Sequence, residues 1–405
     1  MYAKMISALF YMFFTCVIFN PQVNGVTIYL YVMLPFLDPG YSRFLAQTLD
    51  RWSFPLGIAV VTCLLTTPMS AAKIVSISIC VGYLMYTIAR RIGYLHFWMG
   101  INVAFGIVQF ALFYVDANLA SQFGPDNVSR LLWGASATQT NPNFYEIFYF
   151  TRVSAFSREA GFFSSLLVAS LLLYLLEGRS NWKMIVLYAV GLMICFSKSS
   201  FEFLIFASLY PFRRQLRGVH PLFAIFAFVA ACSGLAIYLS HHNFFESETF
   251  AHRLGGFPFL FDARLDDVLQ GLNARQLISR YDYLPYIHME RAYYAAGDGT
   301  FCGFPGLVAD IGLVGALVLL GVVAFTASDG FVMLLTLLIT ATVGLATVTS
   351  FVPIAYLICY WPRFSAFLAR HAGLERMRGP LPEGKQIARH RPEMPVKALR
   401  RHRHG

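Results

Sequence analysis

A series of apolar runs separated by short polar stretches is the feature that most limits how this chain can fold. A helix that crosses the hydrocarbon core of a bilayer needs about twenty predominantly apolar residues, and about twelve runs approach that length. Of the 405 residues, 57% are hydrophobic and 13% are charged, which gives more apolar surface than a soluble domain can bury. The sequence therefore predicts an all-α fold, a polytopic bundle of about twelve transmembrane helices.

The expected spans follow one another closely. We expect them at 5–19, 26–38, 54–66, 71–88, 94–115, 161–176, 184–196, 201–212, 221–239 and 304–326, with a final pair between 330 and 362. One unbroken crossing from 184 to 212 is the alternative to two short helices, but it would place basic residues 213–217 and the C-terminal tail outside the cell. The first run lacks a small-residue cleavage site after it, so we expect a retained helix rather than a cleaved signal peptide.

Lysine and arginine residues set the expected orientation, because short cytoplasmic loops are enriched in them. In this scheme one side of the membrane receives Lys4, Arg43, Arg51, Arg90, Arg91, Arg179, Lys183, Arg213, Arg214 and Arg217. We expect that side to be the cytoplasm, with both termini there. The long loops 116–159 and 240–305 and the turn 197–200 then face outward.

The chain is expected to contain a membrane domain over 1–369 and a disordered, basic cytoplasmic tail over 370–405. Residues 363–405 carry eleven Lys and Arg and three Glu, a net charge of +8, so most of the chain's charge of +10 lies near the C-terminus. Such a tail is typical of a topogenic and solubilising segment, with contact with anionic membrane lipid as the alternative, and no nucleic-acid partner is expected. The seven cysteines show no CxxC spacing, and we predict no metal and no cofactor.

Arg158 and Glu159 stand at the outer start of the span that begins at 161. Charged side chains at this depth are costly and tend to mark functional sites. Sequence neighbours on a helix point away from each other, so these two residues are poorly placed to pair with one another. We therefore predict that both residues bind a ligand, with snorkelling to the membrane interface as the alternative.

Three short motifs occur in order around the two long loops. Residues 158–163 read Arg-Glu-Ala-Gly-Phe-Phe, residues 197–200 read Ser-Lys-Ser-Ser, and residues 309–315 read Ala-Asp-Ile-Gly-Leu-Val-Gly. In this order and topology they resemble the motifs of the Wzy-type polysaccharide polymerase and O-antigen ligase superfamily. The resemblance covers roughly residues 152–315.

This resemblance implies a membrane glycosyltransferase in the inner (plasma) membrane, active in exopolysaccharide or O-antigen biosynthesis. Its donor would be an undecaprenyl-diphosphate-linked oligosaccharide, and its acceptor a sugar hydroxyl on the outer face. A chain-length regulator and export proteins are the expected partners. Two other functions stay open: an O-antigen ligase, and a transporter or flippase for lipid-linked sugars. A transporter would hold ionisable residues at mid-membrane depth, whereas the candidates here cluster at one outer edge.

A diphosphate leaving group concentrates negative charge, which arginine binds with two parallel hydrogen bonds. The residues that we predict at the diphosphate are Arg158, Glu159, Lys198, Arg280 and Arg291. Arg280 and Arg291 belong to the polar loop 240–305 and would share a face if that segment were helical. Lys198 is also four residues from Glu202 and could simply pair with it.

The acceptor hydroxyl needs a proton acceptor near neutral pH, and His288 is the only histidine in the second half of the large loop. Glu290, Asp298 and Asp310 are the alternatives. Asp310 matches the family carboxylate by position, but it could also neutralise an arginine or cap its helix. Ligases of this family carry a histidine shortly before the third motif, and 300–303 contains none. This difference favours the polymerase.

Overall fold

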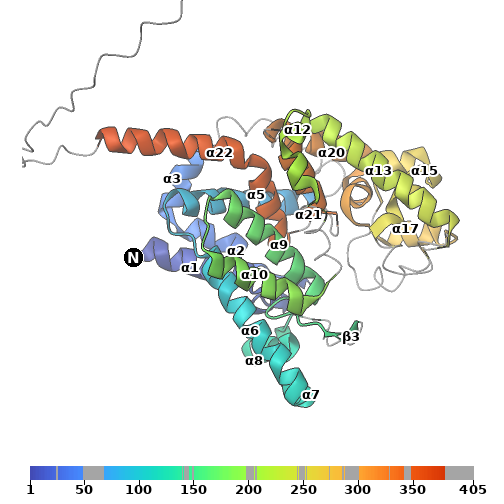
Figure 1. Ribbon diagram of the computed structural model, residues 1–405. Helices are drawn as coiled ribbons and strands as arrows, with labels where there is room; N and C mark the ends of the chain where they lie inside the picture. Colours follow the sequence, from blue (N-terminus) through green and yellow to red (C-terminus); the bar gives the residue numbers. More distant parts are fainter. Residues whose placement is uncertain are drawn as a thin grey trace, which may run out of the picture. The chain divides into compact units, whose positions relative to one another are not determined.

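The computed structural model describes residues 1–23, 26–48, 68–138, 140, 146–147, 150–197, 205, 208–243, 245, 251, 253–272, 274–284, 287, 301–327, 329–341 and 348–378. These residues are mostly helical (Figure 1). The chain divides into two units, residues 1–364 and 365–405. In the second unit, the structure describes residues 365–378, which are helical and extend past the predicted start of the tail at 370.

The elements of the first part of the chain are α1 (Tyr2–Thr15), η1 (Val17–Phe19), β1 (Gln22–Val23), β2 (Val26–Thr27), α2 (Leu30–Met33), η2 (Leu34–Leu37), α3 (Pro39–Thr48), α5 (Pro68–Ala89), α6 (Leu95–Val115), α7 (Ala117–Gln122), α8 (Pro125–Trp133), η4 (Gly134–Ser136), β3 (Glu146–Ile147) and β4 (Phe150–Thr151). The strands form two antiparallel pairs, β1 with β2 and β3 with β4.

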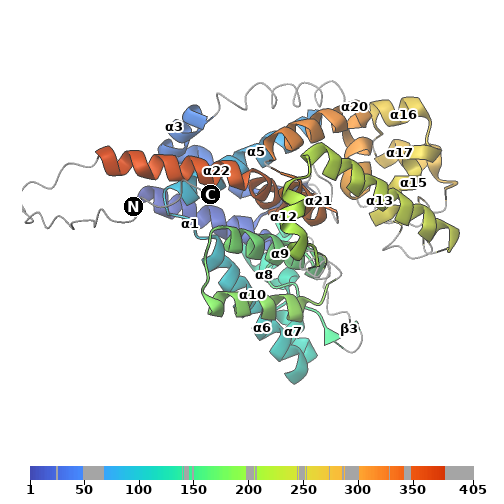
Figure 2. The same ribbon diagram turned by 45° about the horizontal axis from the view of Figure 1, so that its top comes forward.

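The elements of the later part are α9 (Ala160–Leu176), α10 (Trp182–Cys195), η5 (Tyr210–Phe212), α12 (Arg213–Arg217), α13 (Pro221–His241), α15 (Gly256–Asp262), α16 (Leu265–Gln270), α17 (Ala274–Tyr281), α20 (Gly303–Thr326), α21 (Gly330–Ile339) and α22 (Phe351–Arg378). Helices α6, α9 and α10 pack against one another (Figures 1 and 2).

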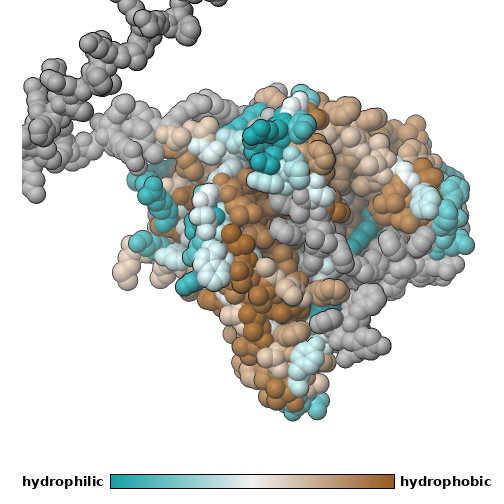
Figure 3. Space-filling view, viewed as in Figure 1, coloured by the Kyte–Doolittle hydropathy of each residue, from teal (hydrophilic) through white to brown (hydrophobic). Residues whose placement is uncertain are grey.

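Five helices among the described residues are long and apolar enough to cross a membrane. They belong to α5, α6, α13, α20 and α22, and α9, α10 and α21 are shorter apolar helices. The exposed surface of α6 and α10 is strongly apolar, whereas hydrophilic residues gather at α12 (Figure 3). Only 17% of the α13 span is buried within the protein, and apolar side chains exposed in this way suit contact with lipid rather than water. The chain is therefore a multi-pass, all-α membrane protein.

Several predicted helices agree closely with the structure. The expected spans 94–115, 221–239 and 304–326 correspond to α6, α13 and α20. The total of about twelve spans is not confirmed by the described residues. The expected helix 54–66 and half of 201–212 fall outside them.

The predicted span 26–38 is wrong. These residues form part of the β1–β2 hairpin and then the two short turns of helix α2 and η2, which are too short to cross a bilayer. The buried side chain of Asn20 explains the change, because its carbonyl accepts a hydrogen bond from the Leu30 N–H (2.9 Å) and its amide donates to the Phe13 carbonyl (2.9 Å). Asn20 therefore folds the chain back at this point.

The polar insert 240–305, predicted as one large loop, contains helices and a hydrophobic cluster that neighbouring helices complete. Helices α15 and α17 contribute Phe257, Phe259, Leu277 and Tyr281 to this buried cluster, which also includes Ala236 of α13 and Ala309 of α20. We refer to the described residues 251–287 as the insert subdomain. Its helices lie beside α13 and α20 (Figures 1 and 2).

Two glycines join the insert subdomain to α20. Gly312 breaks the helix with φ 74° and ψ 163°, and Gly271 has φ 80°. A Cβ atom at Gly312 would lie 2.2 Å from the Leu269 carbonyl oxygen, and one at Gly271 would lie 2.7 Å from the Gly312 nitrogen. The Leu272 N–H donates to the Ala309 carbonyl (2.8 Å) beside them. The glycine of the third motif thus has a structural role, because only glycine tolerates this backbone and this close approach.

Candidate functional site

A tight turn places Arg158 and Glu159 at the N-terminal end of α9. The Ser157 N–H donates to the Ser154 carbonyl (2.9 Å), and Ala155 within this turn has φ 49°. The ring of Phe156 stacks on that of Phe105, with centroids 4.0 Å apart. Packing therefore fixes the chain before the helix. Glu159 occupies the N-cap position of α9, but its side chain makes no capping hydrogen bond to the first turn of the helix.

The first two motifs meet at this helix end. A Cβ atom added at Gly161 would lie 3.4 Å from Glu159 Oε1 and 3.7 Å from Ser197 Oγ. The Val153 N–H donates to the carbonyl of Ile194 (3.2 Å), which ties the segment before α9 to the end of α10. Lys198, the cation of the second motif, lies outside the described residues.

A small cavity of about 20 Å³ adjoins Arg158. Its lining residues are Val17, Tyr29, Ser157, Arg158, Phe162, Leu166, Thr349, Ser350 and Phe351. Ser157 and Thr349 are 1% and 8% exposed, and their hydroxyl oxygens have no hydrogen-bond partner among the described residues. Buried polar groups are normally satisfied, so these two hydroxyls leave hydrogen-bonding capacity that a bound molecule could use.

The electrostatics of this cavity favour a negatively charged group. The N-terminus of α9 carries backbone N–H groups without intrahelical partners and the positive end of the helix dipole. Arg158 adds a guanidinium group to the lining. Together these features resemble the usual anion site at a helix N-terminus. The volume admits about one water molecule, so a phosphate group requires the side chain of Arg158 or Phe162 to move.

Arg280 lies in a different environment, within the insert subdomain. It forms an ion pair with Asp267, which is mostly buried. Asp267 also accepts a hydrogen bond from the Tyr281 hydroxyl (2.6 Å), and that hydroxyl accepts one from the Arg264 N–H (3.0 Å). Burial and the hydrogen bond to Asp267 raise the pKa of Tyr281 above its ordinary value. Arg280 thus helps to hold α16 and α17 together.

Asp310 belongs to α20 and interacts electrostatically with Lys73 of α5. Both helices are candidate membrane spans. Lys73 was not predicted as a site residue, although it lies within the expected span 71–88 and a charged residue at a membrane span was the reason for choosing Arg158. The interaction between Lys73 and Asp310 could not be predicted from the sequence, because the two residues are far apart in the chain.

The predicted site residues are therefore only partly brought together. Arg158 and Glu159 lie at one helix end, whereas the cavity beside Arg158 is lined by neither Arg280 nor Asp310. His288, Glu290 and Arg291 fall outside the described residues, as does Asp298. The residues that the sequence analysis missed at this site are Ser157 and Thr349, whose burial could not be read from the sequence.

Comparison of the chain with protein-family models, curated proteins and solved structures gave no match.

Proposed function

We propose that this protein is a membrane glycosyltransferase that polymerises lipid-linked oligosaccharide repeat units, and that the N-terminal end of α9 binds the diphosphate of the donor. The observation that carries the proposal is the combination of Arg158, a helix N-terminus and two buried hydroxyls at one cavity, for which the described part of the chain offers no hydrogen-bond partner. Arginine and a helix N-terminus both suit phosphate oxygens. The motifs at 158–163, 197–200 and 309–315, which resemble the polymerase and ligase superfamily, support the same reaction.

In the proposed reaction, the bond between the anomeric carbon and the diphosphate oxygen breaks, and its electron pair leaves with undecaprenyl diphosphate. The acceptor hydroxyl forms the new glycosidic bond and gives its proton to a base. Arg158, with Lys198 and Arg291 approaching from other segments, would stabilise the charge that develops on the leaving group. His288, Glu290 and Asp310 are the proposed proton acceptors.

The proposed setting is the inner membrane, with about twelve spans and both termini in the cytoplasm. The end of α9 that carries Arg158 would then face outward, where the lipid-linked repeat units are joined. A chain-length regulator and export proteins would act next to the polymerase. The C-terminal basic tail would contact anionic lipid on the cytoplasmic side.

Replacement of Arg158 tests the proposal in the native host. We expect deletion of the gene to leave single repeat units, and Arg158→Ala to behave like the deletion because the diphosphate loses its cation. Arg158→Lys should retain partial activity, since lysine keeps the charge but loses the two parallel hydrogen bonds. Glycan length on gels is the measurement, with membrane protein level as the check on folding.

Arg130→Ala is the matched control, because Arg130 is an exposed arginine of α8 that only pairs with Asp126 on the same helix. It should give full-length polymer. If Arg158→Ala also gives full-length polymer at a normal protein level, the proposed diphosphate site is wrong. An O-antigen ligase would instead leave long chains that are not attached to their final acceptor.

A transporter of lipid-linked sugars is the second candidate, because the Lys73–Asp310 interaction joins two membrane spans. Ionisable pairs inside the bilayer often mark transport pathways. The two candidates differ in what accumulates after gene deletion. A transporter defect leaves the lipid-linked unit on the cytoplasmic leaflet, whereas a polymerase defect leaves it on the outer leaflet.

A further inference from the structure

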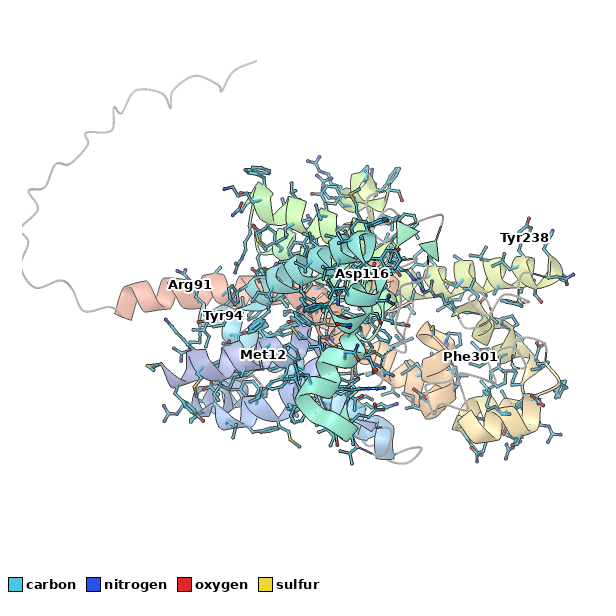
Figure 4. All side chains as sticks on the ribbon, turned by 90° about the horizontal axis from the view of Figure 1, so that it is seen from below. Met12, Arg91, Tyr94, Asp116, Tyr238 and Phe301 are labelled. Atoms are coloured by element: carbon cyan, nitrogen blue, oxygen red, sulfur yellow. The ribbon has the colours of Figure 1, made fainter. Side chains whose placement is uncertain are left out.

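A second and larger cavity lies at the opposite end of α9. Its volume is about 280 Å³, and it is lined by Tyr11, Ile88, Arg91, Gly93, Leu95, His96, Glu177 and Arg179. These residues come from α1, from the turn between α5 and α6, from the start of α6 and from the end of α9. Figure 4 labels Arg91 and Tyr94 in that turn. We refer to this space as the α9 C-terminal cavity.

The carboxylate in this cavity is already neutralised. Glu177 Oε2 lies 2.5 Å from Arg179 Nε and 3.4 Å from His96 Nε2. The other ring nitrogen of His96 is hydrogen-bonded to the Tyr188 hydroxyl (2.8 Å). The Glu177 charge is therefore balanced by Arg179, and the imidazole of His96 is held in a fixed orientation. What remains of the local charge is the guanidinium group of Arg91.

Arg91 has no ion-pair partner among the described residues. Its side chain is exposed at the mouth of the cavity. The charged residues of the lining are Arg91, Arg179 and Glu177. The charge that lines the cavity is thus net positive, as for a site that receives an anion.

The backbone of Arg91 supplies an independent observation. Helix α5 ends in a Schellman motif, in which the Ile92 N–H donates to the Thr87 carbonyl (2.9 Å) and the Arg91 N–H donates to the Ile88 carbonyl (3.1 Å). Arg91 occupies the left-handed position of this motif, with φ 54°. Glycine is the favoured residue there, and another residue costs about 1–2 kcal/mol. An unfavourable residue at a strained position is a reason to look for a function of its side chain.

We infer that the α9 C-terminal cavity binds a phosphate group through Arg91, with Arg179 as a second donor. Guanidinium groups are the preferred partners of phosphate oxygens. The volume suits one phosphate or the phosphodiester of a lipid head group rather than a large ligand. The site is distinct from the proposed diphosphate site at the other end of α9 and does not depend on the proposed function.

The glycine variant Arg91→Gly separates binding from folding. It removes the cation and at the same time supplies the residue that the Schellman position prefers, so it should fold at least as well as the wild-type protein. Arg90→Ala is the matched control, because Arg90 is the neighbouring exposed arginine but does not line the cavity. Thermal unfolding of both variants checks the fold.

Two binding measurements on the purified full-length protein distinguish the source of the phosphate. In detergent, calorimetric titration with inorganic phosphate tests a soluble ligand. In nanodiscs of phosphatidylcholine with or without phosphatidylglycerol, native mass spectrometry tests retention of the anionic lipid. We expect at least one of these probes to bind the wild-type protein and Arg90→Ala alike, and Arg91→Gly to weaken that binding about tenfold or more.

Binding of phosphate in detergent would assign the site to a soluble phosphate, and retention of phosphatidylglycerol alone would assign it to a lipid head group. Either result supports the inference if the binding is also weakened in Arg91→Gly. The inference is overturned if neither probe binds the wild-type protein, or if Arg91→Gly binds both probes as the wild-type protein does.

Discussion

The contact between Gly312 and the insert subdomain leads to a sharp prediction for Gly312→Ala. Alanine would have to adopt φ 74° and ψ 163°, a region that is almost restricted to glycine and costs about 1–3 kcal/mol. Its Cβ atom would also lie 2.2 Å from the Leu269 carbonyl oxygen. The Leu269 carbonyl oxygen is a backbone atom and cannot rotate away from the added methyl group as a side chain could. We therefore expect the insert subdomain to separate from α20.

The expected loss follows from these terms. Separation breaks the hydrogen bond from the Leu272 N–H to the Ala309 carbonyl, which contributes about 0.5–1.5 kcal/mol. With the backbone strain, the free energy of unfolding should fall by about 2–4 kcal/mol. Thermal unfolding in detergent measures the loss. Hydrogen exchange at the Leu272 amide reports separation directly, because that amide should exchange much faster in the variant.

Gly321→Ala is the matched control in the same helix. Apart from the backbone of its own helix, no atom of the described residues lies within 4 Å of a Cβ added at Gly321, so alanine there should be neutral or stabilise by up to about 1 kcal/mol. Equal stability of Gly312→Ala and Gly321→Ala, with unchanged exchange at Leu272, would refute the structural role that we assign to the glycine of the third motif.

Two further predictions concern charged and titrating groups. Lys73→Met should lower the free energy of unfolding because it removes the electrostatic interaction of Lys73 with Asp310, and Asp310→Asn added to it should recover much of the loss in thermal unfolding; additive effects of the two changes would contradict the coupling. Tyr281→Phe should cost about 1–3 kcal/mol because Asp267 loses a donor. Since the pKa of Tyr281 is raised in the folded protein, its contribution is fully present below the unfolded pKa of about 10 and is lost as the pH rises through the folded value. Denaturant unfolding at a series of alkaline pH values should therefore show a loss of stability that Tyr281→Phe lacks, and an identical pH dependence of the two proteins would contradict the assignment.

Hydropathy was sufficient to predict the helices that face lipid. The runs that became α6, α13 and α20 are predominantly apolar, and they are long enough to be recognised as spans. The start of α9 was predictable for the same reason, because Arg158 and Glu159 mark the transition. In these places the local sequence alone determines the structure, since a backbone in lipid must satisfy its own hydrogen bonds.

Long-range contacts account for what the sequence did not show. Asn20 bends the chain through hydrogen bonds to Phe13 and Leu30, so the apolar run after it does not become a span. Arg280 is paired with Asp267 only because α16 and α17 pack side by side. Arg91 was visible as part of an Arg-Arg pair, but its left-handed backbone, the feature that distinguishes it from Arg90, belongs to the folded turn.

The hydrogen bond from Leu272 to Ala309 joins the insert subdomain to a helix that is synthesised after it. A nascent chain leaves the ribosome from its N-terminus, so the insert subdomain emerges before the helix that receives it. Until α20 has been translated and inserted, the cluster around Phe257 lacks two of its members, Phe301 and Ala309. A translation arrest before residue 303 should therefore leave the insert subdomain incomplete and sensitive to proteases. The insert subdomain can complete its hydrophobic cluster only when α20 has been inserted into the membrane.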